Sequence, residues 1–237
     1  MKRVSFLVSV LFALFLISCD NSGIVGEGEI KIRSVELPDK IEGIKFYNSA
    51  DVYLVQSAVQ DVILEGQDNI LDNLKLNVKD NVLEVDEERN VRQHDVLRIY
   101  ISMETLKQIS LFGSGTIRTE NTFEGLERIV IRLSGSGNIE AEMESEKTEV
   151  RLSGSGKVAL EGRTTEATLE LSGSGNIDAE SYLCEKVQAD ISGSGNIKVA
   201  VERYLDVDIT GSGSVYYRGT PETVSTHIEG SGNVKKF

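Results

Sequence analysis

The residues of this sequence whose type and spacing best suit catalysis or metal binding are acidic. Glutamate occupies every second position of one short segment, at Glu140, Glu142, Glu144 and Glu146. On an extended strand these carboxylates would share one face, where two of them could act as acid and base in glycoside cleavage or recruit Ca²⁺. A solvated acidic face explains the same spacing, and nothing fixes a ligand count. We therefore predict neither a catalytic site nor a metal site.

The histidine and cysteine residues do not form a recognisable catalytic group with other residues. His94 lies in a polar stretch and His227 lies beside Ile228, and neither has a recognisable nucleophile or ligand partner. We expect both to be ordinary surface histidines, and we expect Cys184 to be a small buried apolar residue. The prediction is a protein without a cofactor and without enzymatic activity.

The first residues of the chain predict where in the cell the protein is located. Residues 1–17 have a short basic start and a long apolar run, too short to span a bilayer comfortably and typical of a signal peptide. The run ends in Leu16-Ile17-Ser18-Cys19, which resembles a bacterial lipobox. The resemblance implies that residues 1–18 are removed and that lipid on Cys19 holds the protein on an envelope membrane. An ordinary secretory signal is the alternative. We expect the outer membrane, on its periplasmic or exposed side, with residues 19–31 as a flexible tether.

The composition limits the partners. There are 38 Asp and Glu residues against 25 Lys and Arg residues, which gives a formal net charge of −13. A surface that binds phosphates needs clustered Lys and Arg, so we predict no nucleic-acid partner. Hydrophobic residues make up 40% of the chain, which is ordinary for a folded protein, whereas 22 glycines beside 2 prolines are unusual.

An internal repeat dominates the second half of the chain. Gly-Ser-Gly recurs seven times, beginning at Gly113, Gly135, Gly154, Gly173, Gly193, Gly211 and Gly230. The residue two before each first glycine and the residue four after it are aliphatic in every copy, and mostly polar residues alternate with them. This pattern predicts two half-buried strands joined at a glycine corner. Because one unit cannot bury its own apolar stripe, the units must stack.

Stacked units predict an all-β fold, a right-handed parallel β-helix of about seven coils with Gly-Ser-Gly at the corners. Glycine would supply positive φ there, and we expect the asparagine that follows the tripeptide in four copies to tolerate left-handed geometry. Leu152, Leu171 and Ile191 should then occupy successive layers of one internal column. We assign the β-helical domain to residues 32–237 and its regular repeats to residues 109–237.

Residues 32–108 carry strand signals without a clear repeat, and they predict irregular coils or hairpins that cap the start of the helix. Lys79-Asp80-Asn81 predicts a hairpin turn. Lys45–Val52 resembles a degenerate copy of Leu111–Ile117. Whether this segment continues the same coil stays open at the level of sequence.

From about residue 31 onward the chain resembles the bacterial family described as putative auto-transporter adhesin, head GIN domain. The resemblance rests on the lipobox, on Phe46–Leu54, Asn81–Val85 and Leu106–Gly115, and on the recurrent Gly-Ser-Gly-Asn-Ile. It implies an all-β, β-helical protein of the cell envelope. It brings no catalytic residues.

We therefore predict a non-catalytic, lipid-anchored protein of the cell envelope with an adhesin-like binding role. Its partner would be a glycan or a host or envelope protein. The candidate contacts are Tyr182, Tyr204, Tyr216 and Tyr217, because tyrosine stacks well on sugar rings. Two alternatives remain: a polysaccharide-active enzyme on the same scaffold, and a structural protein that forms homo-oligomers through unpaired strand edges at the helix ends.

Overall fold

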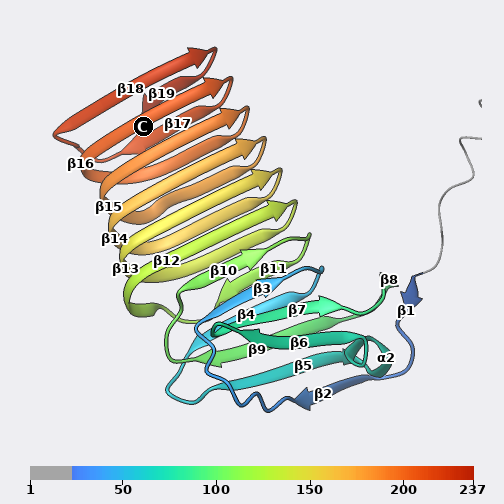
Figure 1. The fold of residues 1–237 in the computed structure, drawn as a ribbon. Helices are drawn as coiled ribbons and strands as arrows, with labels where there is room; N and C mark the ends of the chain where they lie inside the picture. The colour runs from blue at the N-terminus through green and yellow to red at the C-terminus, as the bar shows by residue number, and fades with distance from the viewer. Residues whose placement is uncertain (1–22) are drawn as a thin grey trace, which may run out of the picture.

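The structure is a computed structural model that describes residues 23–237, so the predicted signal peptide and Cys19 lie outside the described residues. Within that range one sheet of 17 strands winds into a solenoid, and the short helix α2 (Asp68–Leu71) lies at its start (Figure 1). The predicted all-β, right-handed β-helix of about seven coils is confirmed.

Five long strands form the regular body. They are β12 (Phe123–Gly135), β13 (Asn138–Gly154), β14 (Lys157–Gly173), β15 (Asn176–Gly193) and β16 (Asn196–Gly211). Each strand bends once, ends on the first glycine of a tripeptide and pairs in parallel with the next. Leu152 is in register with Leu171, and Leu171 with Ile191, and all three are buried. The predicted internal column is therefore confirmed.

The two glycines of each corner are needed for different reasons. Gly173 has φ of +120°, in the region that favours glycine. The φ of Gly175 is not positive, but a Cβ on Gly175 would lie 2.5 Å from the carbonyl oxygen of Gly156 in the coil before it. The predicted left-handed role of the asparagines is wrong, because the described non-glycine residues with positive φ are Asp80 and Asn81. The corner asparagines instead begin extended strands, and the Asn196 side-chain amide donates to the Asn176 side-chain oxygen in the neighbouring coil at 3.3 Å.

The coil stacked before the first Gly-Ser-Gly coil comes from a distant, earlier part of the chain. β3 (Gly43–Phe46) and β4 (Asp51–Gln56) stack directly on β10 (Gln108–Leu111) and β11 (Thr116–Thr119). Phe46 is in register with Leu111, and Val52 with Ile117, so the degenerate copy is a true coil. β7 (Val82–Glu87) and β9 (Leu97–Met103) form the layer before it. The order of layers therefore differs from the order of the chain.

Antiparallel strands close the N-terminal end. β5 (Asp61–Gln67) pairs with β9, β2 (Ile30–Ser34) with β5, and β6 (Leu74–Lys79) with β7 through the predicted hairpin turn. A separate pair joins β1 (Ile24–Val25) to β8 (Val91–Gln93). β1 and the start of β2 fall inside the predicted tether of residues 19–31, so residues 24–25 and 30–31 are paired strands rather than tether.

The C-terminal end is open in the described chain. It consists of β17 (Ser214–Arg218), β18 (Thr223–Gly230) and β19 (Asn233–Lys236). Val224 and Ile228 continue columns of buried residues, yet they are 40% and 39% exposed. Here the last coil lacks a neighbour on one side, because β18 and β19 pair with β16 and β17 alone among residues 23–237.

Candidate functional site

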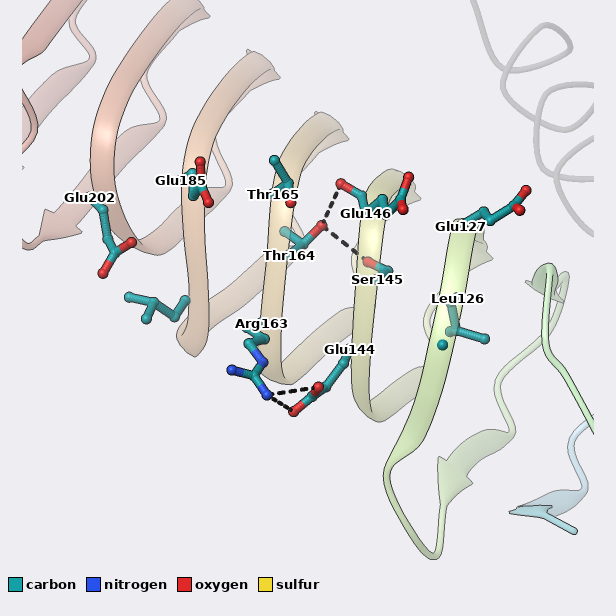
Figure 2. Close-up of a pocket in the computed structure, with 12 residues that line it drawn as sticks. Leu126, Glu127, Glu144, Ser145, Glu146, Arg163, Thr164, Thr165, Glu185 and Glu202 are labelled. Atoms are coloured by element: carbon teal, nitrogen blue, oxygen red, sulfur yellow. Dashed lines mark hydrogen bonds and ion pairs between the residues drawn. The ribbon is translucent and has the colours of Figure 1, made fainter.

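Each regular coil turns a second time, away from its Gly-Ser-Gly corner. In β14 the alternation of buried and exposed residues holds to Thr164 and resumes, one residue out of phase, at Ala167. The chain bends at this slip. Successive bends of β12 to β16 line an open groove of about 520 Å³ (Figure 2), which we call the bend groove.

Negatively charged side chains outnumber positively charged ones in the bend groove. Its lining includes one arginine, Arg163, and five glutamates, Glu127, Glu144, Glu146, Glu185 and Glu202. Arg163 donates to both carboxylate oxygens of Glu144 at 2.8 and 2.9 Å (Figure 2). Arg203 lies 3.7 Å from Glu185. Among the described residues the other three carboxylates have no ion-pair partner, so the groove carries a net negative charge.

The groove also has an apolar component and a rigid floor. Leu183 lines the groove, is 44% exposed, and stands two positions before Glu185 on β15. Beneath it, the hydroxyl of Tyr182 lies 2.7 Å from the Thr148 hydroxyl and 3.0 Å from the Ser145 hydroxyl. Ser145 in turn donates to Thr164 at 3.0 Å (Figure 2). This network joins three successive coils and holds the bends in place.

The hydroxyl of Tyr182 on β15 reaches past β14 to Ser145 and Thr148 on β13. Met143, Gly162 and Tyr182 are in register on β13, β14 and β15, and all three positions belong to one inward column. A Cβ on Gly162 would collide with the carbonyl oxygen of Met143, so no larger residue fits. The ring of Tyr182 is completely buried, and burial raises the pKa of its hydroxyl. The prediction that Tyr182 contacts a ligand is therefore wrong.

The other predicted tyrosines do not form one surface. Tyr204 is 38% exposed, and the guanidinium of Arg203 lies 5.4 Å from the centre of its ring. Tyr216 and Tyr217 lie on β17, beyond the Gly-Ser-Gly corner from Tyr204, and Tyr217 packs against the core. Tyr204 and the two tyrosines of β17 thus lie on different arms of the coil.

Two aromatic pairs near the N-terminal end were missed by the sequence analysis. Tyr47 and Phe112 stack with ring centres 5.0 Å apart, and Tyr53 and Tyr100 stack at 4.9 Å. Arg118 lies over Tyr53, with 5.6 Å from its guanidinium to the ring centre. The match between Lys45–Val52 and Leu111–Ile117 contained the signal for the first pair, because it aligns Tyr47 with Phe112.

The predicted acidic segment is divided by the bend. Glu140 and Glu142 are exposed on the arm before it, whereas Glu144 and Glu146 line the bend groove. In residues 23–237 no group of three or more His, Cys, Asp or Glu residues is placed to hold a metal ion. His94 and His227 lie at opposite ends of the solenoid, near β8 and on β18.

Cys184 is buried as predicted. Its side chain has no exposed surface, and its thiol donates to the carbonyl oxygen of Tyr182 at 3.3 Å. Burial raises the pKa of the Cys184 thiol to about 12. The residue therefore behaves as part of the apolar core.

The solenoid is similar to several solved structures. A protein from Bacteroides fragilis described as a putative adhesin is 28% identical, with a TM-score of 0.83 over 91% of this chain and 100% of that chain. A putative lipid binding protein from Parabacteroides distasonis is 24% identical, with a TM-score of 0.75 over 91% and 100%. A putative adhesin from Parabacteroides merdae is 21% identical, with a TM-score of 0.72 over 91% and 99%. No curated protein matches the chain.

The family comparison covers most of the folded chain. Residues 41–221 match the sequence model of the family described as putative auto-transporter adhesin, head GIN domain. The match includes the coil built from β3 and β4, the bend groove and all but the last of the Gly-Ser-Gly corners. This chain therefore belongs to the putative auto-transporter adhesin, head GIN domain family.

Proposed function

We propose that this protein is a non-catalytic, lipid-anchored protein of the cell envelope that binds a partner through the bend groove. The observation that carries the proposal is the groove itself, which crosses five coils and holds unpaired carboxylates beside the exposed Leu183. The adhesin descriptions of the family and of the Bacteroides fragilis protein support a binding role. They also support a protein without catalysis.

The groove favours a partner segment that carries positive charges and an apolar side chain. Neighbouring coils are about 4.8 Å apart, so carboxylates on different coils are separated along the solenoid by multiples of this distance. Positive groups on the partner would meet Glu127, Glu146 and Glu202, while an apolar group would cover Leu183. Because the rims are open to solvent, the attraction should weaken as salt concentration rises.

A preformed groove reduces the entropy that binding would otherwise cost. The hydroxyl network of Tyr182, Thr148 and Ser145 joins the coils directly under the groove. Parallel pairing on both sides of the bends joins β12 to β16, although the register shifts near the bends in three of the four strand pairs. Binding therefore need not order a loop before contacts form.

The anchor and the envelope location are part of the same proposal. Cys19 stands five residues before Ile24, the first residue of β1, so lipid on Cys19 would hold the solenoid at the membrane surface. None of the helices in residues 23–237 has the length and apolar character needed to cross a membrane. A Cys19→Ser variant should leave the membrane fraction, and mass spectrometry of the mature N-terminus should show the lipid on Cys19 in the unchanged chain.

Binding through the groove is tested by one charge reversal and a matched control on the same strand. The probe is a short oligolysine peptide that contains one leucine, titrated into residues 19–237 carrying Cys19→Ser. Glu146→Lys should weaken binding several-fold at low salt, whereas Glu140→Lys, outside the groove, should leave it nearly unchanged. Equal loss in both variants, or binding that ignores salt, would contradict the groove as the contact surface. Release of reducing sugar from a glycan panel would favour an enzyme instead.

A further inference from the structure

β2 has an unusual distribution of side chains. Its two isoleucines point to solvent, with Ile30 45% and Ile32 72% exposed. The residues between and after them, Lys31 and Arg33, point to the other face and bind Asp68 and Asp72 at the helix α2. An edge strand normally presents its charges to water, so this strand is apolar on the side where polar residues are expected. We call the surface of Ile30 and Ile32 the β2 face.

The β2 face lies at the end of the molecule where the chain enters. β2 pairs with β5 on one side, and in residues 23–237 no strand pairs with its other side. β1 lies at the same end, far from the C-terminus (Figure 1). Val25 on β1 is also exposed. Three exposed branched residues thus lie between residues 25 and 32.

The length of chain before β1 limits how far this end can stand from Cys19. Ile24 lies five positions after Cys19, and a fully extended chain covers at most about 17 Å over that length. Ile24 is fixed to the body, because its backbone N–H donates to the Asn90 carbonyl at 2.9 Å. A lipid on Cys19 would therefore bring β1 and β2 to the membrane surface.

Charge around the β2 face favours apolar contact over electrostatic attraction. The positive charges of Lys31 and Arg33 are matched by Asp68 and Asp72, and the exposed Glu27 and Glu29 precede the strand. The whole chain is strongly acidic. An anionic lipid surface would repel such a protein, so a neutral or zwitterionic surface is the fitting partner.

We propose that the β2 face rests in the interfacial region of a lipid bilayer and sets the orientation of the anchored solenoid. This inference rests on the proposed lipid anchor at Cys19. Shallow insertion of Ile30 and Ile32 covers their exposed surface and holds the N-terminal end against the membrane. The bend groove, on β12 to β16, is then carried away from the bilayer toward its partner.

The absence of tryptophan from the chain allows a direct test. Lipidated Ile32→Trp protein is reconstituted into zwitterionic vesicles that contain bromine-labelled acyl chains, which quench nearby tryptophan. Phe237→Trp, at the opposite end, is the matched control. Quenching should be at least about twofold stronger for Ile32→Trp and should persist at high salt. Circular dichroism confirms that both exposed-site variants are folded.

The outcomes separate this inference from the proposed function. Vesicle-bound protein with equal quenching at both positions overturns the orientation and leaves the lipid anchor standing. Protein that carries no lipid on Cys19 and does not float with vesicles overturns both. Stronger quenching in anionic than in zwitterionic vesicles would show electrostatic attachment and would also overturn the inference.

Discussion

Replacing Gly173 by alanine tests the physical account of the corners most directly. Gly173 has φ of +120°, and a Cβ there would lie 2.5 Å from the carbonyl oxygen of Gly154 in the coil before it. The three atoms nearest to that Cβ are all backbone atoms of Gly154, so no side chain can rotate away. Ser174 is the matched control, because its side chain is exposed. Its contact with Gly154 is made by its backbone N–H, which donates to the Gly154 carbonyl oxygen at 3.0 Å and is kept in an alanine variant.

The expected loss in the free energy of unfolding of Gly173→Ala is the sum of two destabilising effects and one smaller stabilising effect. The backbone conformation costs alanine about 1–3 kcal/mol. Pushing two coils apart to admit the methyl group costs a further ~1–3 kcal/mol. Alanine also restricts the unfolded chain, which returns about 0.4–1 kcal/mol. Gly173→Ala should therefore lower the free energy of unfolding by about 1–6 kcal/mol, or Tm by roughly 2–24 °C.

The assay is thermal and urea unfolding followed by far-ultraviolet circular dichroism. Ser174→Ala should change the free energy of unfolding by less than about 0.5 kcal/mol. Gly175→Ala should resemble Gly173→Ala although its φ is not positive, because its Cβ would lie 2.5 Å from the Gly156 carbonyl oxygen. Equal stability of Gly173→Ala and Ser174→Ala would refute the account of the corner.

Three other predictions follow from buried or paired groups. Tyr182→Phe should cost about 1–3 kcal/mol in thermal unfolding, because a buried hydroxyl network loses its central member. The Lys107 ammonium holds the pKa of Glu42 at about 2, so this carboxylate stabilises the fold above its unfolded pKa and loses that contribution as pH falls toward 2. Glu42→Gln should thus cost about 1–2 kcal/mol near pH 7 and almost nothing near pH 2 in urea titrations, with allowance for solvent around the lysine. In Cys19→Ser protein, a thiol reagent at neutral pH should label Cys184 only after unfolding, because burial raises its pKa to about 12.

The repeating half of the fold was predictable because its information is local. Aliphatic residues at fixed distances from each Gly-Ser-Gly determine which side of the strand is buried, and the nearly constant period forces equivalent residues such as Leu152 and Leu171 into one column. The error about the corner asparagines came from the same local reasoning, since both glycine and asparagine tolerate left-handed geometry. The first glycine takes that conformation, and Asn176 is then free to extend.

The candidate site depended on contacts between coils, which no single repeat contains. The sequence determined that Tyr182 belongs to a strand, but its burial depends on its place beside Gly162 in the stack and on the Ser145 and Thr148 hydroxyls one coil farther away. The bend groove arises where the alternation slips phase, and its charge is the sum of five coils.

By itself the sequence determined the period, the buried columns, the glycine corners and the family. Only the tertiary structure decided that β3 and β4 lie under β10 and β11, that β2 turns its isoleucines outward, and which carboxylates meet at the bends. The physical reason is that alternation specifies which face of a strand is buried, whereas the neighbour of that strand is chosen by packing between residues far apart in the chain.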